Sequence, residues 1–190
     1  YATVDMMEQE RRRYPAFNIP IAVLPASIDN NLPGWPMAVG ADTALNTVVE
    51  SIDMVRMSAS ASKRAFVVET MGRHAGWLAL QGGESSGAYI ILIPEYPFEL
   101  ERVFELLRGR KGREVQYSIV VVSEGACLKG EGEFCKDERL DEFGHRTLGG
   151  IAAFLSDQIQ RNTGFESRYV ILSHLQRGGV PSARDRLMAR

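Results

Sequence analysis

The segment Pro25–Asn31, with the sequence PASIDNN, carries a carboxylate that could act as a base. It follows the apolar run Ile19–Leu24, which predicts a buried strand. Asp29 would then lie just beyond a strand end, where a carboxylate can accept a proton from a substrate hydroxyl. The structural alternative is that Asp29 only caps the turn before Gly34, because Asp and Asn are favoured in turns.

Two later segments place cations after predicted strands. Glu69–His74 reads ETMGRH, and Ser173–Gly179 reads SHLQRGG. The guanidinium groups of Arg73 and Arg177 suit a phosphate dianion, because each offers several donors in a planar fork. One base together with two cationic loops predicts phosphoryl transfer to a hydroxyl of a phosphorylated small molecule.

Length and composition narrow the class of protein. The chain has 190 residues, of which 45% are hydrophobic and 24% charged, as expected for one ordinary domain or two small lobes with a buried core. A net charge of −2 gives no support for a nucleic-acid partner. No apolar run approaches the roughly 18 residues of a membrane span. The local clusters of basic residues are therefore expected to bind small anions.

The two cysteines, Cys127 and Cys135, lie in a stretch rich in Gly, Glu and Lys, without His or Cys at metal-ligand spacing. This pattern predicts free thiols and a cytoplasmic protein rather than a disulfide or metal site. The chain begins at Tyr1 without a signal-peptide pattern and ends at Arg190 inside a helix predicted to begin near Ser182. We therefore expect it to be part of a longer polypeptide.

Helical and strand patterns alternate along the chain. β-rich runs separated by amphipathic helices indicate βαβ units and a mainly parallel sheet, so the predicted fold class is α/β. The longest amphipathic pattern, Thr43–Met57, has Asp42 or Thr43 as its expected N-cap. Further helices are predicted at Val4–Arg13, Glu99–Leu107 and Ile151–Arg161, and further strands at Ala65–Val68, Tyr89–Ile93, Ser118–Val122 and Tyr169–Leu172.

In sheets of this kind, ligands bind at the carboxyl ends of the strands. Four separate segments follow predicted strands and are expected to converge on one cleft. They are Asp29, Met71–Arg73, Glu124 and His174–Arg177.

Other conspicuous residues are interpreted as structural. Gly82-Gly83 is expected to end the helix after Arg73 or to form a tight turn, since no lysine follows at P-loop spacing. The stretch Lys129–Gly144 is expected to be a surface insertion without regular structure. His74 and His145 are interpreted as structural or surface residues.

With these segments in hand, the chain resembles the 6-phosphofructokinase family, over nearly all of its length. Three motifs in the family's order carry the resemblance: Ser27-Ile28-Asp29-Asn30, Met71-Gly72-Arg73 and His174-Leu175-Gln176-Arg177-Gly178-Gly179. The resemblance implies a fragment of a fold with two Rossmann-like lobes and mainly parallel sheets. Residues 1–40 and 177–190 would belong to the nucleotide-binding lobe, and residues 41–176 to the sugar-phosphate lobe.

The resemblance also implies roles for individual residues. Asp29 would take the proton from the 1-hydroxyl of fructose 6-phosphate, while Ser27 and Arg73 would meet the transferring phosphoryl group. Two of the sugar-phosphate ligands, Arg64 and Arg168, would come from a neighbouring subunit. The implied substrate-binding residues are Arg64, Met71, Gly72, Glu124, Arg168, His174 and Arg177.

The implied reaction is the glycolytic transfer from ATP, with Mg²⁺, to give fructose 1,6-bisphosphate. Ala26 favours ATP, because the pyrophosphate users commonly have a lysine directly before the Ser or Thr of this motif. A pyrophosphate-dependent enzyme remains an alternative. A non-catalytic regulatory subunit that binds sugar phosphate is another, although the retained Asp29 argues against it. The family's nucleotide and magnesium loops would lie upstream of Tyr1, so this chain alone is expected to be incomplete.

Some positions depart from the family pattern. Asn31 stands where a second Asp is usual, and Trp35-Pro36 replace smaller polar residues. Arg56 matches an arginine of the family's allosteric site, but Tyr89 stands where that site has an acidic magnesium partner, so regulation by adenine nucleotide is in doubt. By analogy we expect a homo-oligomer, a tetramer, without a membrane partner.

Overall fold

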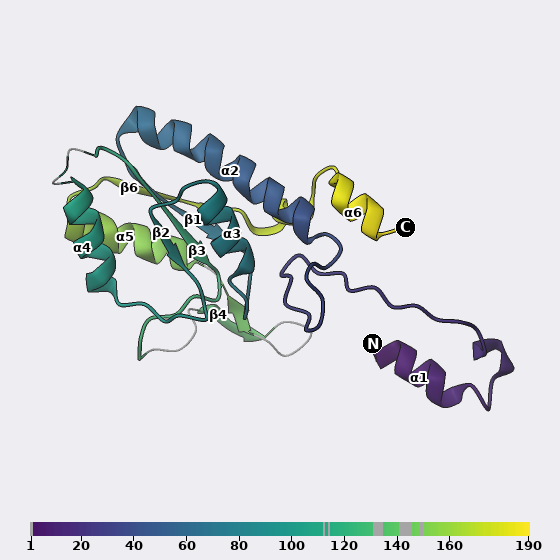
Figure 1. Cartoon of the computed structure of the whole chain (residues 1–190). Helices are drawn as coiled ribbons and strands as arrows, with labels where there is room; N and C mark the ends of the chain where they lie inside the picture. The colour runs from purple at the N-terminus through teal and green to yellow at the C-terminus, as the bar shows by residue number, and fades with distance from the viewer. Residues whose placement is uncertain (1, 112, 114, 131–134, 141–145, 149) are drawn as a thin grey trace.

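A computed structural model describes residues 2–111, 113, 115–130, 135–140, 146–148 and 150–190 of the chain (Figure 1). Its body is a parallel four-stranded sheet with the strand order β2-β3-β1-β6. The register aligns Ala65 of β1 with Ser118 of β3 and with Ser167 of β6. The strands are β1 (Ala65–Thr70), β2 (Ile90–Leu92), β3 (Ser118–Ser123) and β6 (Ser167–Ile171). The predicted α/β class and parallel sheet are confirmed.

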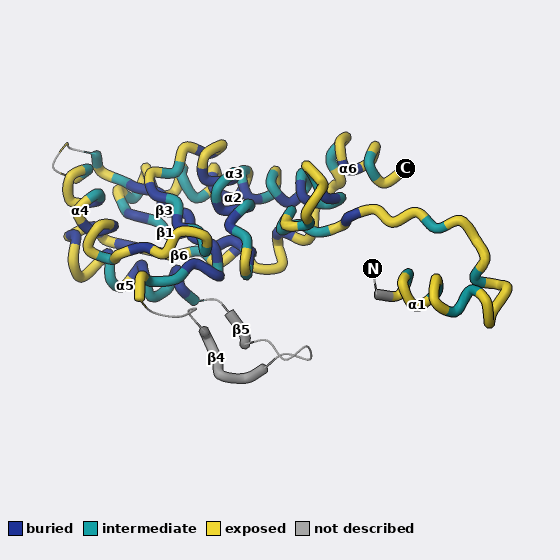
Figure 2. Tube along the Cα trace, turned by 60° about the horizontal axis from the view of Figure 1, so that its bottom comes forward, coloured by how far each residue is buried: buried dark blue, intermediate teal, exposed yellow. Residues whose placement is uncertain are grey.

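Helices cover both faces of this sheet (Figure 1). Successive strand residues point to opposite faces, and the core is accordingly split in two. Val68 and Val121 pack with residues of α2 and α3, whereas Val67 and Val120 pack with residues of α4 and α5. Figure 2 shows the buried residues concentrated in these central layers. The helices are α2 (Ala41–Ser62), α3 (Trp77–Ser85), α4 (Leu100–Lys111) and α5 (Ile151–Thr163).

The predicted helices are all present, with shifted ends. The first is α1 (Ala2–Glu10), followed by the 3-10 turn η1 (Pro15–Phe17), and the last is α6 (Ala183–Met188), capped by Ser182. The predicted N-cap of α2 was wrong. The helix begins after Gly40, which has a φ of 95° and no capping side chain. The amide groups of Gly40 and Thr43 instead donate to Asp185 of α6.

The prediction that Gly82-Gly83 ends a helix was also wrong, because both residues lie inside α3. They permit close packing there. A Cβ atom on Gly82 would approach Val48 Cγ1 to 2.5 Å, and one on Gly83 would approach Ile91 Cδ1 to 2.7 Å. The pair therefore lets α3 pack closely against α2 on one side and against the sheet on the other.

The predicted strand Ile19–Leu24 was wrong. This segment is extended but forms no strand among the described residues, and it leads from α1 to the body as an arm (Figure 1). Ile19 and Leu24 are 50% and 54% exposed, and Figure 2 shows most of the arm as exposed. An apolar run forms a strand only where a second strand satisfies its backbone groups, and the described residues supply none here. The first pairing beyond the arm is an isolated bridge between Ala26 and Val39.

The prediction that the stretch Lys129–Gly144 has no regular structure was wrong in part. Its described part contains β4 (Cys135–Leu140), which pairs antiparallel with β5 (Arg146–Leu148) through two register shifts. Cys127 is a free thiol. The side chain of Cys135 and the whole of His145 lie outside the described residues. None of the described helices is long and apolar enough to cross a membrane.

Candidate active site

The loop after β1 is held in a conformation that requires glycine. Gly72 has a φ of 135°, and a Cβ atom there would lie 2.3 Å from the carbonyl oxygen of Ala75. Its own carbonyl oxygen accepts hydrogen bonds from Ser123 Oγ, at 2.6 Å, and from the Gly125 amide, at 3.2 Å. The Met71-Gly72-Arg73 motif is thus fastened to the end of β3.

Glu124 follows β3 and faces the same loop. Its amide donates to the Thr70 carbonyl at 2.9 Å, and its Oε1 accepts from the Gly72 amide at 3.3 Å. Burial raises the pKa of the Glu124 carboxyl, and the nearby charges of Glu69 and Asp29 raise it further, against the opposing Gly72 hydrogen bond and Arg73. A half-buried carboxylate next to a cation can accept hydrogen bonds from the hydroxyl groups of a ligand.

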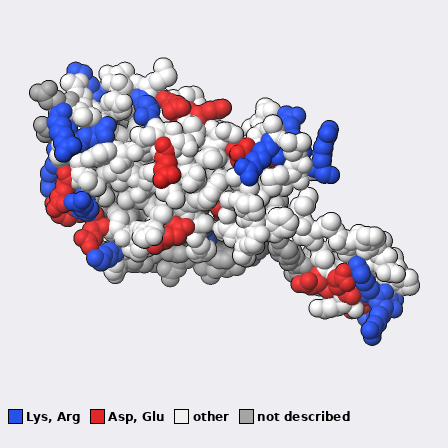
Figure 3. Space-filling view, viewed as in Figure 1, with Lys and Arg blue, Asp and Glu red and all other residues white. Residues whose placement is uncertain are grey.

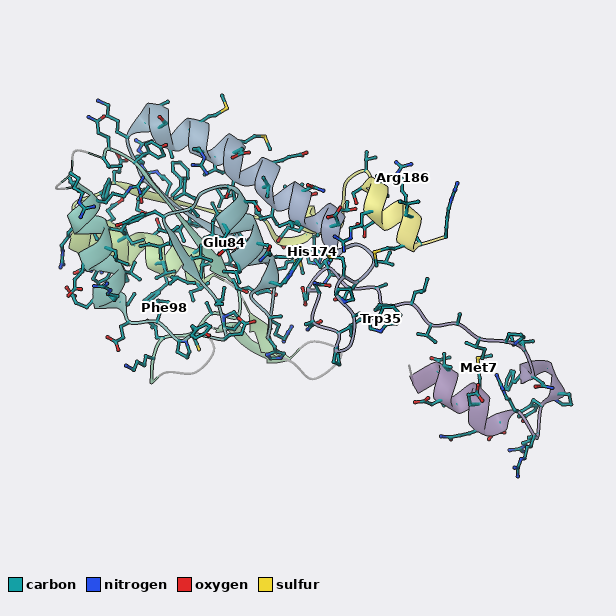
Figure 4. All side chains as sticks on the ribbon, in the orientation of Figure 1. Met7, Trp35, Glu84, Phe98, His174 and Arg186 are labelled. Atoms are coloured by element: carbon teal, nitrogen blue, oxygen red, sulfur yellow. The ribbon has the colours of Figure 1, made fainter. Side chains whose placement is uncertain are left out.

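The loop after β6 is the 3-10 helix η2 (Ser173–Arg177). It is tied to the β1 loop by Gln176, whose side chain is 1% exposed. Gln176 Oε1 accepts from the Met71 amide at 3.3 Å, and its Nε2 donates to the Ser173 carbonyl at 3.0 Å. Sequence reasoning missed this residue. Its signal was a long polar side chain between His174, labelled in Figure 4, and Arg177, and both of these neighbours are exposed.

Asp29 lies on a closed loop and not at the end of a sheet strand. The loop is shut where the Ser27 amide donates to the Val39 carbonyl, at 3.2 Å. Asn30, with a φ of 49°, braces it by accepting from the Ala38 amide at 2.7 Å. Ser27 Oγ accepts from the Asp29 amide at 3.3 Å. The side chains that brace this loop by hydrogen bonds between described residues are therefore those of Ser27 and Asn30, and the turn role considered for Asp29 falls to its neighbours.

The charges of the three loops meet at Asp29. Burial raises the pKa of its carboxyl above the ordinary value, and the charges of Arg177, Arg73 and His74 oppose that rise. Asp29 and Arg177 also line one cavity of about 390 Å³, together with Ala26, Ser27, Ile28 and Val39. Asp29, Ser27 and Arg177 thus line one cavity, Arg73 and Glu124 lie within electrostatic reach of Asp29, and His174 lies in η2 with Arg177.

Arg64 and Arg168 do not join this group within the chain. They lie at the amino ends of β1 and β6, and the six residues of β1 span about 20 Å. Both contact one carboxylate, that of Glu166, at 2.9 Å from Arg64 Nε and 2.6 Å from Arg168 Nη2. Figure 3 shows Lys and Arg side chains next to Asp and Glu side chains at the end of the body far from the arm. Among the described residues no group of three His, Cys, Asp or Glu side chains could hold a metal ion.

Comparisons with known proteins agree with this geometry. A family model described as phosphofructokinase matches residues 1–190. The pyrophosphate–fructose 6-phosphate 1-phosphotransferase of Amycolatopsis methanolica is 45% identical over 171 residues, which cover 90% of this chain and 50% of that protein. The ATP-dependent 6-phosphofructokinase of Mycobacterium bovis is 41% identical over 172 residues, with the same two coverages. The chain spans about half the length of these curated relatives.

Solved structures give the same result. Phosphofructokinase from Saccharomyces cerevisiae superposes with a TM-score of 0.78 and 30% identity, covering 99% of this chain and 24% of that one. A pyrophosphate-dependent phosphofructokinase from Marinobacter aquaeolei superposes with a TM-score of 0.76 and 26% identity, covering 98% of this chain and 46% of that one.

Proposed function

The chain belongs to the phosphofructokinase family, and on that premise we propose that the protein transfers a phosphoryl group from ATP to the 1-hydroxyl of fructose 6-phosphate. One observation carries the proposal. A half-buried carboxylate, Asp29, shares a cavity with Arg177 and lies within electrostatic reach of Arg73. A base surrounded by cations is what an alcohol acceptor and a phosphorylated donor require.

In the proposed reaction Asp29 accepts the proton of the 1-hydroxyl while that oxygen forms a bond to the terminal phosphorus of ATP. The bond from this phosphorus to the bridging oxygen breaks, and the electron pair leaves with ADP. Arg73 and the Ser27 hydroxyl stabilise the charge on the transferring group. Ser27 can do so because its hydroxyl hydrogen remains a donor while its oxygen accepts from the Asp29 amide.

The sugar phosphate is held by the loops around Asp29. Glu124 accepts from a sugar hydroxyl, and its hydrogen bond from Gly72 supports this role by fixing the carboxylate. The Met71-Gly72 backbone lines the sugar. His174 and Arg177 bind the 6-phosphate, a dianion that a guanidinium can contact through two parallel hydrogen bonds.

Arg64 and Arg168 serve the site of a neighbouring subunit in a homo-oligomer, by analogy a tetramer. Their location supports this division of labour, because both lie at the amino ends of their strands and share Glu166. The Arg64 guanidinium lowers the pKa of the Glu166 carboxyl, with help from Arg168, so this carboxylate holds the two arginines together. The two arginines would therefore already lie side by side when a phosphate binds in the neighbouring site.

ATP is the proposed donor. Relatives of both donor classes match at similar identity, 45% and 41%, so the choice rests on Ala26. This residue lines the cavity of Asp29 and Arg177, and its small side chain leaves room for the α-phosphate of a nucleotide. Residues 1–40 and 177–190 are proposed to belong to the nucleotide-binding lobe, a view supported by the exposed apolar side chains of Ile19 and Leu24. No step is assigned to a metal ion held by the described residues.

Replacement of Asp29 in the full-length protein tests the function. In Asp29→Ser, kcat with ATP and fructose 6-phosphate should fall by several orders of magnitude, because the base is lost while the binding loops remain. Sugar-phosphate affinity, measured by calorimetry, should stay within a few-fold of the wild-type value. If the variant turned over at the wild-type rate, Asp29 would have no part in the mechanism. If the parent protein used pyrophosphate but not ATP, the proposed donor would be wrong and pyrophosphate would take its place.

A further inference from the structure

Asp185 is a buried carboxylate for which the proposed reaction has no role. It lies in the six-residue helix α6, where it is 3% exposed. Its neighbours Arg184 and Arg186 are exposed, and Figure 4 labels Arg186 on this helix. Its Oδ1 accepts from the Gly40 amide at 2.8 Å. Its Oδ2 accepts from the Thr43 amide at 2.8 Å and from the Thr43 hydroxyl. The carboxylate thus replaces the missing side-chain cap of α2.

These bonds also fix the segment that carries Arg177. The Thr43 hydroxyl donates to Asp185 and accepts from the Ser182 amide at 3.0 Å. Gly179, with a φ of 108°, lies so close to α2 that a Cβ atom would be 3.3 Å from Thr47 Oγ1 and 3.8 Å from Thr43 Cγ2. The chain from Arg177 to α6 is therefore fastened to the first turn of α2.

The same turn of α2 carries the loop of Asp29. Gly40 directly follows Val39, whose amide donates to the Pro25 carbonyl at 2.8 Å and whose carbonyl accepts from the Ser27 amide at 3.2 Å. These two bonds close the loop at its base. A shift of Gly40 would consequently move both ends of the loop that presents Asp29.

Apolar packing does not fill the space between the two segments. A cavity of about 330 Å³ lies there, bounded by Ile28, Gly40, Gln176, Arg177 and Asp185 among others. Because a void contributes no packing contacts on its open side, the hydrogen bonds of Asp185, together with the bond from the Ser182 amide to Thr43, hold the segments next to this cavity. Those bonds lower the pKa of the Asp185 carboxyl against the opposing effect of burial, so its charge is retained.

We propose that Asp185, acting through Thr43 and Gly40, is a positioning residue that sets Asp29 against Arg177. The inference rests on the proposed function for its catalytic consequence. It also predicts a purely structural consequence: without the carboxylate, the loop of Asp29 opens more often, whatever reaction the protein catalyses.

The experiment compares four variants of the full-length protein. Asp185→Asn removes the carboxylate charge, and Thr43→Val removes the hydroxyl that bridges Asp185 and the Ser182 amide. Thr43→Ser keeps the hydroxyl. Thr47→Val is the matched control, since among the described residues the hydrogen bond of Thr47 Oγ1 stays within α2, to the Thr43 carbonyl at 3.1 Å. We expect kcat to fall about 10- to 100-fold in the first two variants, as for a displaced catalytic group. KM should change less, and Thr43→Ser and Thr47→Val should stay near the parent.

Amide hydrogen exchange supplies a readout that does not depend on activity. In Asp185→Asn and Thr43→Val, the amides of Ser27, Val39 and Gly40 should exchange faster than in the parent, whereas those of β1 and β3 should not. Unchanged exchange at these amides would overturn the proposal, as would an equal effect of Thr47→Val. If the parent catalyses no transfer to fructose 6-phosphate, the proposed function fails, while the exchange data still decide the role of Asp185.

Discussion

Asp29 and Arg177 line the same cavity although they come from opposite ends of the chain. One lies on the loop before α2, and the other ends the 3-10 helix after β6. Their proximity gives the carboxylate a cationic neighbour that opposes the effect of its burial. The proton affinity of the proposed base is therefore set by tertiary contacts, and it should respond to changes in the arginine.

The first prediction concerns the acid side of the pH profile. The reaction needs ionised Asp29, whose pKa is raised above its ordinary value, chiefly by burial. Activity should be full above the raised pKa and should be lost as the pH falls through it. Arg177→Gln removes a charge that lowers this pKa, so the acid limb of kcat should move to higher pH. Steady-state kinetics at saturating sugar phosphate measures the shift.

Arg177→Lys is the matched control for that shift. It keeps the positive charge but loses the planar fork, so the acid limb should remain near its wild-type position while KM for the sugar phosphate rises. Identical acid limbs in all three proteins would show that Arg177 does not tune the base.

Much of the sheet could be predicted from the sequence because its signals are local. Continuous apolar runs such as Ile119–Val122 are typical of strands covered on both faces, and the structure confirms that strand as fully buried. The proximity of the candidate site residues Arg73 and Glu124 could be predicted from these strands, since the carboxyl ends of parallel strands meet at one edge of the sheet.

The features that could not be predicted depend on partners distant in the sequence. Ile19–Leu24 has strand composition, but its state depends on a partner strand that no local pattern reveals. The start of α2 is set by Asp185, far along the chain. Gln176 is buried because the Met71 amide and the Ser173 carbonyl need partners, and such a need becomes visible only in three dimensions.

The second prediction concerns Gln176 and stability. Gln176→Leu keeps a similar volume but leaves the Met71 amide and the Ser173 carbonyl without their partner. Both hydrogen bonds are partly buried, and a buried polar group that loses its partner costs about 1–3 kcal/mol, so the free energy of unfolding should fall by about 1–3 kcal/mol in urea denaturation. Gln116→Leu, at an exposed position, should stay within about 0.5 kcal/mol of the parent. A stable Gln176→Leu protein would mean that the loops after β1 and β6 hold together without this bridge.

The third prediction concerns the phosphoryl donor. Ala26→Lys would place an ammonium group and a long side chain at the cavity lined by Asp29 and Arg177. Turnover with ATP should fall at least about tenfold, since both room and charge balance change, and the ratio of pyrophosphate to ATP activity should rise. Coupled assays with each donor measure the ratio. Ala61→Lys, on the exposed end of α2, should leave it unchanged, and an unaltered ratio in Ala26→Lys would remove this residue from donor choice.

The fourth prediction tests whether the two distant arginines act across a subunit interface. Asp29→Ser lacks the base, and Arg168→Ala lacks a proposed ligand of the neighbouring site, so each oligomer alone should be nearly inactive well below the KM for sugar phosphate. In a mixed pair, one site combines the intact Asp29 of one subunit with the intact Arg168 of the other. Random pairing gives this combination at about one quarter of all sites, so the coexpressed mixture should show about one quarter of the wild-type activity, and an isolated one-to-one pair about one half. Coexpression of the two variants with different affinity tags isolates the mixed oligomer, and no recovery in it would show that Arg168 does not serve a neighbouring site.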